Sequence, residues 1–223
     1  MIKAIIIGGT GATGNYLVKK LIDNNNCLSV TSIGRRPVLN GEKIKKLVDV
    51  RVKSLLDLSE TQKYWCEQDV FFNCIGTTRK RAGGANEFID IEAGISYEGA
   101  KMASNAKIPH ASLISAKGAN HKAWANNWIH PLLYIRTMGQ KEQTIESNFS
   151  FENTSIFIPG MLIRLKKKRS KLDIFFESIG FGLGVDNLAE AMILNAERVK
   201  AGLEKKRNRQ FIGNDYISSY LNK

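Results

Sequence analysis

Residues 4–22 read AIIIGGTGATGNYLVKKLI, and this stretch decides the fold. The isoleucines after Ala4 form a short β-branched run that suits a buried strand, and from Leu17 onward apolar residues recur at helical spacing. Glycines separate the two segments, and glycine accepts a positive φ and lets another group approach the backbone. A strand, a glycine turn and a helix N-terminus together make an anion site, because unpaired N–H groups and the helix dipole point toward the ligand. The four glycines are Gly8, Gly9, Gly11 and Gly14.

The glycine turn fits two related dinucleotide-binding patterns. Residues 9–14, GTGATG, match G-x-G-x-x-G, and the glycines at 8, 11 and 14 match the spacing of short-chain dehydrogenases. Each match alone is weak, because a turn with a purely structural role uses the same residues. Since this turn follows a strand and opens a helix, we expect it to bind a dinucleotide. The residues expected to contact the cofactor are Gly8, Thr10, Gly11, Ala12, Thr13 and Gly14.

The composition is that of a globular protein. With 223 residues, 43% of them hydrophobic, the chain is long enough for one large domain. No apolar run reaches the roughly 18 residues of a membrane-spanning helix, so we expect no transmembrane segment; the first strand also starts too early for a secretory leader. Three cysteines without C-x-x-C spacing, Cys27, Cys66 and Cys74, indicate a reduced, cytosolic protein. The net charge of +12 favours anionic ligands or partners without pointing specifically to nucleic acid.

Strand-like and helix-like segments alternate along the chain. This alternation predicts a Rossmann-like, doubly wound α/β fold, a parallel sheet with helices on both faces. We expect one domain over residues 1–223, with substrate or lid elements at about 120–130 and 160–185. Further strands are expected at 28–33, 48–58, 69–76, 110–118 and 153–160, helices at 86–106, 131–148 and 185–199, and a last strand and helix within 210–221.

Ligands on doubly wound sheets bind beyond the carboxyl ends of the strands. Segments that are far apart in the sequence should therefore converge on one cleft. These segments are 8–14, Arg35, 76–78, 115–117 and 159–162.

The end of the second strand indicates which dinucleotide binds. NAD enzymes of this class carry Asp or Glu about 20 residues past the glycines, where it binds the ribose 2′-hydroxyl. This chain has Arg35 and Arg36 there, and guanidinium groups form bidentate, charge-assisted bonds with phosphate. The 2′-phosphate of NADP is the natural match, and a solvated basic turn is the alternative. Asp57 is a weaker candidate, for the adenine amino group, because a loop Asp often caps a helix instead.

Five motifs, in this order and spacing, resemble the atypical short-chain dehydrogenase/reductases, and most closely the HIV-1 Tat-interacting (tumour-suppressor) oxidoreductase family. The similarity covers about residues 1–195, and GTTR is its most specific part. The resemblance implies a Rossmann fold that binds NADPH through the glycine turn, Arg35 and Arg36, with contacts from Ile75, Gly76 and Leu162. It also implies a cytoplasmic protein with a nuclear fraction and an unidentified carbonyl substrate. The motifs are GGTGATG (8–14), IGRR (33–36), GTTRKRAGG (76–84), LISAKGA (113–119) and IPGML (158–162).

The chemistry that the resemblance implies needs a Tyr and, four residues later on the same helix face, a Lys. The Tyr exchanges a proton as hydride moves, the Lys lowers the pKa of the Tyr and holds the nicotinamide ribose, and a Ser after the fifth strand holds the substrate carbonyl. Tyr134 and Ser115 match, but Met138 stands at the Lys position and has no donor. Lys141 lies on nearly the same face, about 10.5 Å further along the helix, and Lys117 is another cation near the cleft.

Three functions fit these residues. The first is a carbonyl oxidoreductase of weak or altered activity, which uses Tyr134 with a substitute cation. The second is a catalytically impaired NADPH-binding protein with a regulatory or interaction role. In the third, Tyr134 is only a helix residue and the cleft serves another purpose. Resemblance of fold does not decide among them.

The remaining features carry less weight. The three histidines lack metal-ligand spacing, so we expect no metal site. Trp124 and Trp128, one helical turn apart, suit either a substrate lid or surface packing. The basic run RLKKKRSK at 164–171 is either a solvated face or an attraction site for an anionic partner, such as a nuclear-import receptor.

Overall fold

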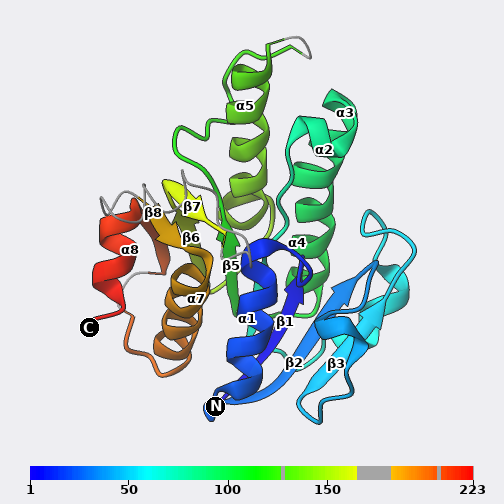
Figure 1. Cartoon of the computed structure of the whole chain (residues 1–223). Coiled ribbons are helices and arrows are strands. Elements are labelled where there is room, and N and C mark those ends of the chain that lie inside the picture. The colour runs from blue at the N-terminus through cyan, green and yellow to red at the C-terminus, as the bar shows by residue number, and fades with distance from the viewer. Residues whose placement is uncertain (127–128, 165–181, 205–206, 223) are drawn as a thin grey trace.

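The centre of the protein is a seven-stranded sheet (Figure 1). The structure is a computed structural model, and it describes residues 1–126, 129–164, 182–204 and 207–222. The strand order is β3-β2-β1-β4-β5-β6-β9, and every neighbouring pair is parallel. This order reverses between β1 and β4, which confirms the predicted doubly wound α/β fold. The strands are β1 (Ile2–Ile7), β2 (Cys27–Gly34), β3 (Leu47–Arg51), β4 (Val70–Asn73), β5 (His110–Ile114), β6 (Asn153–Ile158) and β9 (Asn208–Ile212).

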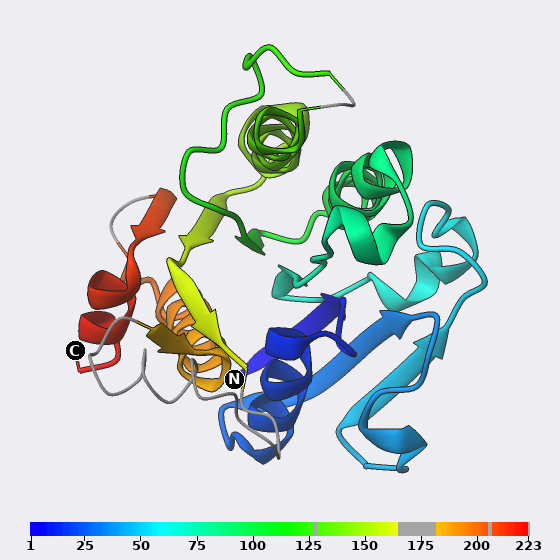
Figure 2. The ribbon, with the colours of Figure 1, turned by 45° about the horizontal axis from the view of Figure 1, so that its top comes forward.

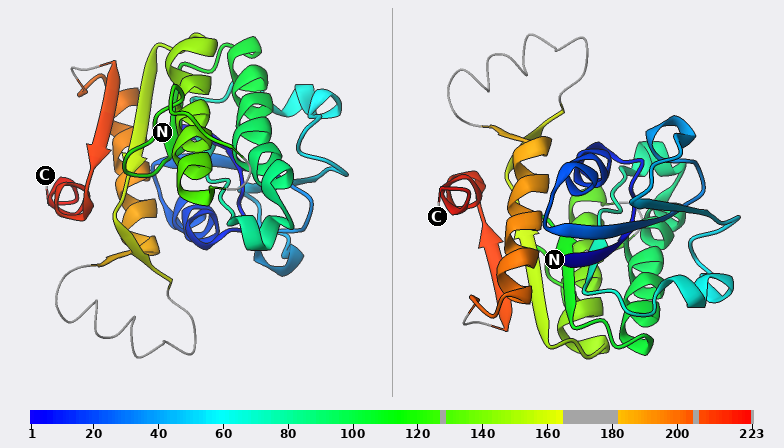
Figure 3. Two further views of the ribbon diagram at one scale, coloured as in Figure 1. Left: turned by 90° about the horizontal axis from the view of Figure 1, so that it is seen from above. Right: turned by 90° about the horizontal axis from the view of Figure 1, so that it is seen from below.

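Helices cover both faces of the sheet, as predicted (Figure 3). On one face α1 packs against α7, and on the other lie α4 and α5. Two short strands, β7 (Met161–Ile163) and β8 (Gly182–Gly184), form a separate pair. The α-helices are α1 (Ala12–Asp23), α2 (Arg79–Ala82), α3 (Ala85–Ile89), α4 (Ile95–Asn105), α5 (His130–Gln143), α7 (Val185–Lys200) and α8 (Asn214–Tyr220); 3₁₀ turns are η1 (Leu39–Gly41) and η2 (Ser59–Tyr64), and π-helical turns are η3 (Asp90–Gly94) and η4 (Thr144–Asn148).

The first strand shows why the sheet needs two helix layers. Successive side chains of a strand point to opposite faces. Ala4 and Ile6 pack in the core beneath α1 and α7, whereas Ile5 and Ile7 pack in the core beneath α4. A strand that is apolar on both sides has to be covered on both sides, which a parallel sheet with crossover helices achieves.

The segment predicted as one helix at 86–106 is helical but has three parts, α3, η3 and α4. The π-helical turn η3 adds a residue to the helical repeat, which the hydrophobic pattern alone did not reveal. Gly99 explains the close approach of α4 to the sheet, because a Cβ there would lie 2.9 Å from Cζ of Phe71.

Several boundaries differ from the predictions. β4 and β5 end at Asn73 and Ile114, earlier than the predicted 76 and 118, because the polar and glycine residues that follow form loops. Within the part of the chain described, no helix has the length and apolar character needed to cross a membrane. The lid elements at 120–130 and 160–185 stay a prediction, and residues 127–128 and 165–181 of them lie outside the described residues.

The glycine turn fixes how β1 meets α1 and β4. Gly8 has a φ of +84°, and a Cβ on it would lie 2.6 Å from the carbonyl carbon of Cys74, just after β4. A Cβ on Gly14 would overlap the carbonyl oxygen of Gly8. Both glycines are therefore required for close packing, in addition to any contact with a ligand.

We predict that Gly8→Ala destabilises the free protein more than Gly118→Ala. Gly118 has the same φ of +84°, but a Cβ added to it would have no atom within 4 Å, so its variant carries only the positive-φ cost of about 1–2 kcal/mol. Gly8→Ala adds an overpacking cost of about 1–3 kcal/mol. Urea unfolding of both variants measures the difference, and equal losses would contradict the close approach of β1 and β4.

Candidate functional site

Parallel pairing brings the carboxyl ends of the central strands to one edge of the sheet. Ile7 at the end of β1 pairs with Ile33 in β2 and with Asn73 in β4, and the pairing continues through β5 and β6. The loops that follow these strands leave from the same edge (Figure 2). The segments 8–14, Arg35, 76–78, 115–117 and 159–162 thus follow strand ends at one edge of the sheet, and their convergence on a single cleft stays a prediction.

The start of α1 offers backbone N–H groups to a ligand. Its N-cap is Gly11, which provides no side-chain cap, and its first turn holds no acidic residue. Thr10 and Ala12 are exposed, whereas Thr13 is buried. The N–H groups of the first turn and the helix dipole therefore suit a negatively charged group. A Cβ on Gly11 would lie 3.1 Å from the carbonyl oxygen of Gly8, so this glycine serves the close packing of the turn. These residues fit the phosphates of a dinucleotide.

Cations gather where β2 and β3 end. Arg35 and Arg36 are exposed just after β2. The register pairs Gly34 with Arg51, so the last residue of β3 brings a third guanidinium to the same corner. Sequence reasoning missed Arg51 because it extended the third strand to residue 58 and so placed its carboxyl end elsewhere.

Asp57 follows β3 by six residues and caps a turn. Its Oδ1 accepts the backbone N–H of Ser59 at 3.0 Å, and hydrogen bonds from Ser59 lower the pKa of the Asp57 carboxyl. This contact closes a local turn just before η2, whose N-cap is Leu58 without a side-chain cap, so the helix-capping alternative is not what forms. Contact with adenine stays a prediction.

A buried ion pair holds the loop after β4. Nζ of Lys141, on α5, donates to Oε2 of Glu92 at 3.1 Å and to the carbonyl oxygen of Ile75 at 2.6 Å. Oε1 of Glu92 accepts the backbone N–H of Thr77 at 2.6 Å. The two charged side chains are only 1% and 3% exposed. The pair thus joins α5, the π-helical turn η3 and the loop that contains Gly76.

The position four residues after Tyr134 offers no cation. Met138 is 4% exposed, and Lys141 is committed to Glu92 and Ile75 rather than standing in for the missing Lys. Burial, with Glu92 nearby, raises the pKa of the Tyr134 phenol above its ordinary value. A catalytic Lys would lower that pKa, so the environment acts in the opposite direction. Lys117 is exposed in the loop after β5.

Ser115 has a carboxyl partner that sequence reasoning did not foresee. Its Oγ donates to Oε1 of Glu142 on α5 at 2.5 Å. Burial raises the pKa of the Glu142 carboxyl, against the lowering effect of the Ser115 hydrogen bond. Glu142 lies one helical turn beyond Met138, on the side of α5 that faces β5.

Tyr134 belongs to a small aromatic cluster above the sheet. Its ring stacks with that of His130, 6.3 Å between centroids and 13° between planes, and with that of Phe88 at 6.0 Å. Phe88 is buried, and α3 supplies it to this cluster. Trp124 is 68% exposed, whereas Trp128 lies outside the described residues.

The other candidate residues take structural places or are not described. Leu162 lies in β7 and packs against the core beneath α1 and α7. Nε2 of buried His110 lies 3.0 Å from Oγ of Ser155, and burial lowers the pKa of this imidazole to about 3. Among the described residues, no group of three His, Cys, Asp or Glu side chains is placed to hold a metal ion. The basic run falls outside the described residues after Arg164.

Glu92 and Glu142 carried a signal in the sequence that could have found them. Glu92 lies four residues after Phe88 and three before Ile95, within the apolar stripe of its helix. Glu142 is eight residues after Tyr134, close to the same helix face. A carboxylate on the buried face of a helix needs a partner, because an unpaired buried charge is costly. The cation available to Glu92 was Lys141 on the neighbouring helix.

The fold has counterparts among solved structures of other proteins. DesIV, a dTDP-glucose 4,6-dehydratase from Streptomyces venezuelae solved with NAD and TYD bound, has a TM-score of 0.68 at 12% identity and covers 99% of this chain and 80% of its own. The oxidoreductase ylbE from Lactococcus lactis has a TM-score of 0.62 at 15% identity, over 88% of this chain and 85% of its own. At these identities the likeness shows the fold.

Sequence comparison identifies the family. FMP52 of Meyerozyma guilliermondii is 32% identical over 177 residues, 79% of this chain and 70% of that protein. HTATIP2 of Rattus norvegicus is 31% identical over 158 residues, 71% of this chain and 62% of that protein. The chain belongs to the atypical short-chain dehydrogenase/reductase family of the FMP52 proteins, and it resembles HTATIP2. Models of protein families were also searched, and none matches.

The expected cytoplasmic and nuclear location is wrong on this comparison. FMP52 relatives from Meyerozyma guilliermondii, Debaryomyces hansenii and Candida albicans are named mitochondrial. Unpaired cysteines indicated a reducing environment, but they do not distinguish the cytosol from a compartment within an organelle. A nuclear-import receptor as partner loses its basis with the nuclear location.

We predict that Lys141→Met lowers the free energy of unfolding by about 3–5 kcal/mol, because it leaves the Glu92 carboxylate buried and without its cation. The control is Lys20→Met. Lys20 pairs with Glu190 at 2.8 Å on the surface, where the partners are 34% and 55% exposed, so its loss should cost about 0–1 kcal/mol. Urea unfolding compares the two variants, and similar small losses would contradict the structural role of the buried pair.

Proposed function

We propose that this protein binds NADPH and is a carbonyl oxidoreductase of low turnover. The observation that carries the proposal is the uncapped start of α1 at Gly11, beside a corner with three guanidinium groups. Solved proteins of this fold, such as DesIV, are described with NAD bound. This likeness supports a nicotinamide dinucleotide, and the arginines support the form with a 2′-phosphate.

The residues that would hold the cofactor divide between its two ends. Backbone N–H groups at Ala12 and Thr13 suit the pyrophosphate, whereas the N–H of Gly11 donates to the carbonyl oxygen of Gly8 at 2.9 Å and shapes the turn. Arg35 and Arg36 suit the 2′-phosphate, and Arg51 adds positive charge at the same corner. Gly76 leaves the third side of the cleft open, because nothing lies within 4 Å of the direction a Cβ would take. Bound NADPH would supply the hydride for a carbonyl carbon.

Two hydroxyl groups are available to a carbonyl oxygen. Tyr134 holds its proton firmly, since the pKa of its phenol is raised. Ser115 is backed by Glu142, and a carboxyl group with a raised pKa carries its proton at higher pH than an ordinary one. In the structure the Ser115 hydroxyl donates its one proton to Glu142. When Glu142 is protonated this bond reverses, so that the carboxyl donates to Oγ and the hydroxyl proton is free for the substrate. As the substrate oxygen takes the Ser115 proton, Glu142 passes its own proton to Oγ and is left as a carboxylate. This route uses the chain's own residues and needs no Lys at position 138.

A second function has one observation in its favour. Met138 is buried and Lys141 is held in an ion pair. The Lys that the family's Tyr–Lys chemistry requires is therefore missing from the helix face of Tyr134. A protein with these features is suited to bind the cofactor without rapid turnover, as a regulatory or interaction protein. Occupancy of its cofactor site would then follow the concentration of NADPH, and the bound NADPH would not be oxidised.

We predict that the protein prefers NADPH to NADH. Loss of a charge-assisted phosphate contact costs about 1.5–3 kcal/mol, so Arg35→Ala/Arg36→Ala should weaken NADPH binding roughly 10- to 150-fold and leave NADH binding nearly unchanged. Lys43→Ala/Lys45→Ala, which removes two charges from the neighbouring loop, is the matched control. Calorimetric titration measures the affinities of the native protein and both double variants for NADPH and for NADH. Equal affinity of the native protein for both cofactors would exclude the 2′-phosphate contact.

We predict that Met138→Lys raises carbonyl turnover while cofactor affinity changes little. The new cation lies one helical turn from Tyr134 and should lower the pKa of the phenol, and general acid–base catalysis contributes typically 10²–10⁴-fold. Met138→Leu keeps the position apolar and serves as the control. NADPH oxidation with a panel of aldehydes and ketones measures kcat and KM. Rapid turnover of the native protein that persists in Tyr134→Phe would show that the Tyr–Lys scheme does not apply.

A further inference from the structure

A cationic pocket lies beside Tyr134, between the loop after β4 and the start of α5. Its volume is about 510 Å³, and its lining comes from Thr78, Arg79, Lys80, Gly83, Gly84 and His130. We propose that this pocket binds the anionic group, a carboxylate or a phosphate, of a carbonyl substrate. The inference rests on the proposed oxidoreductase function and names its substrate class.

The basic wall of the pocket is fixed by the local backbone. Oγ1 of Thr78 accepts the N–H of Arg81 at 3.3 Å and caps the short helix α2. Gly83, with a φ of +103°, ends that helix, and its N–H donates to the carbonyl oxygen of Arg79 at 3.1 Å. The capped turn therefore holds Arg79 and Lys80 at the pocket wall.

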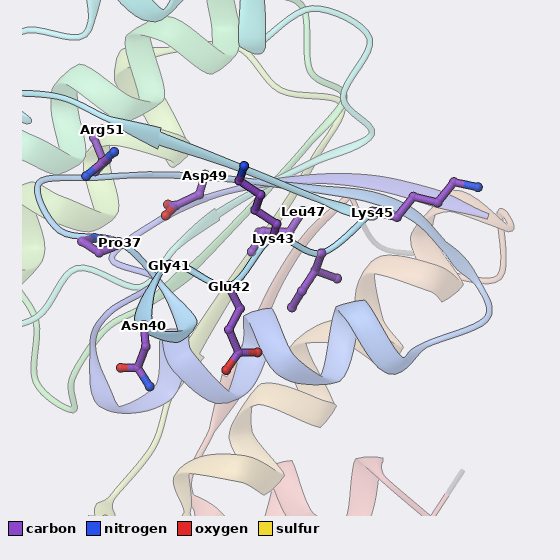
Figure 4. A pocket seen from close by; sticks show the side chains of 10 residues that line it. Pro37, Asn40, Gly41, Glu42, Lys43, Lys45, Leu47, Asp49 and Arg51 are labelled. Carbon is purple, nitrogen blue, oxygen red and sulfur yellow. The ribbon is translucent and has the colours of Figure 1, made fainter.

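The charge of this pocket differs from that of the other large one. The second pocket, of about 620 Å³, lies along β3, where Glu42 and Asp49 stand among Lys43, Lys45 and Arg51 (Figure 4). Charges of both signs line that pocket and offset one another. Among the described residues, the lining of the pocket at Arg79 includes no carboxylate. The acidic residue Glu87 follows in α3, and its side chain folds against Gly84.

His130 links the pocket to the proposed chemistry. It lines the pocket, and its ring stacks in parallel on that of Tyr134, so the two groups are adjacent on α5. Arg79 begins α2, directly after the loop that contains Gly76 and Thr77, and the Lys141–Glu92 pair holds this loop at the edge of the sheet. Through His130, a single extended molecule can therefore be placed with its anion at Arg79 and its carbonyl toward Tyr134.

The occupant we assign is an aldehyde or ketone with one negative charge. Guanidinium and ammonium groups attract carboxylates and phosphates strongly, and the guanidinium group does so with a defined, bidentate geometry. Neutral carbonyl compounds would leave Arg79 and Lys80 without a partner from the substrate. The pocket should thus improve substrate affinity, expressed in KM, more than the rate of the chemical step.

The test compares 4-carboxybenzaldehyde with its methyl ester as substrates for the full chain with NADPH. We expect the native protein to favour the acid in kcat/KM, and Arg79→Glu/Lys80→Glu to reduce that preference at least about tenfold, mainly through KM. Lys43→Glu/Lys45→Glu makes the same change of charge at the other pocket and should keep the preference. An equal kcat/KM for acid and ester in the native protein, or an equal effect of both double variants, would overturn the proposal.

A binding measurement separates this inference from the proposed function. Ligand-observed NMR with NADP⁺ present follows 4-carboxybenzaldehyde directly. If no aldehyde is reduced, yet the acid binds to the native protein and the Lys43→Glu/Lys45→Glu control but not to Arg79→Glu/Lys80→Glu, the anion pocket stands and the oxidoreductase function fails. If the acid fails to bind to the native protein, or binds equally to the Arg79→Glu/Lys80→Glu variant, the pocket assignment fails whatever the turnover.

Discussion

The ion pair of Lys141 with Glu92 is the interaction on which the site depends. It is buried and joins a helix, a π-helical turn and a loop that are far apart in the sequence. Burial of two charges is costly, and the attraction compensates only when the remaining hydrogen-bonding positions are satisfied. Here the amide of Thr77 and the carbonyl of Ile75 supply those bonds. The pair therefore defines where the loop after β4 lies, and with it the third side of the cleft.

The same pair explains how a site of this class loses its usual cation. A Lys on α5 could serve either the fold or the phenol, and in this chain Lys141, in the last turn of the helix, serves the fold. Met138 then fills the position beneath Tyr134 with apolar volume, and the phenol lies among Phe88 and His130. The neighbouring carboxyl of Glu142 accepts a hydrogen bond from Ser115 instead. Under the proposed function, the acid–base groups would therefore be Ser115 and Glu142 rather than Tyr134 and a Lys.

The fold could be predicted from the sequence because its signals are local. The apolar run at Ile5–Ile7, the glycines after it and the alternation of strands and helices each depend on nearby residues. The site was only partly predictable, because its contacts are long-range. Lys141 and Glu92 are 49 residues apart, and no local pattern shows which buried charges meet. Arg51 likewise enters the corner of Arg35 through sheet register, which depends on where β3 ends.

The π-helical turn η3 has a further consequence for the helix that contains it. One additional residue in a helical turn rotates all that follows by about 100° relative to an unbroken α-helix. Upstream of η3 the helix presents Phe88 to the aromatic cluster of Tyr134, and downstream it presents Ile95 to the core of the sheet. The insertion therefore lets one continuous helix take part in two separate packing units. Evolution can alter the aromatic wall of the cleft on one side of η3 while the sheet contacts on the other side stay as they are.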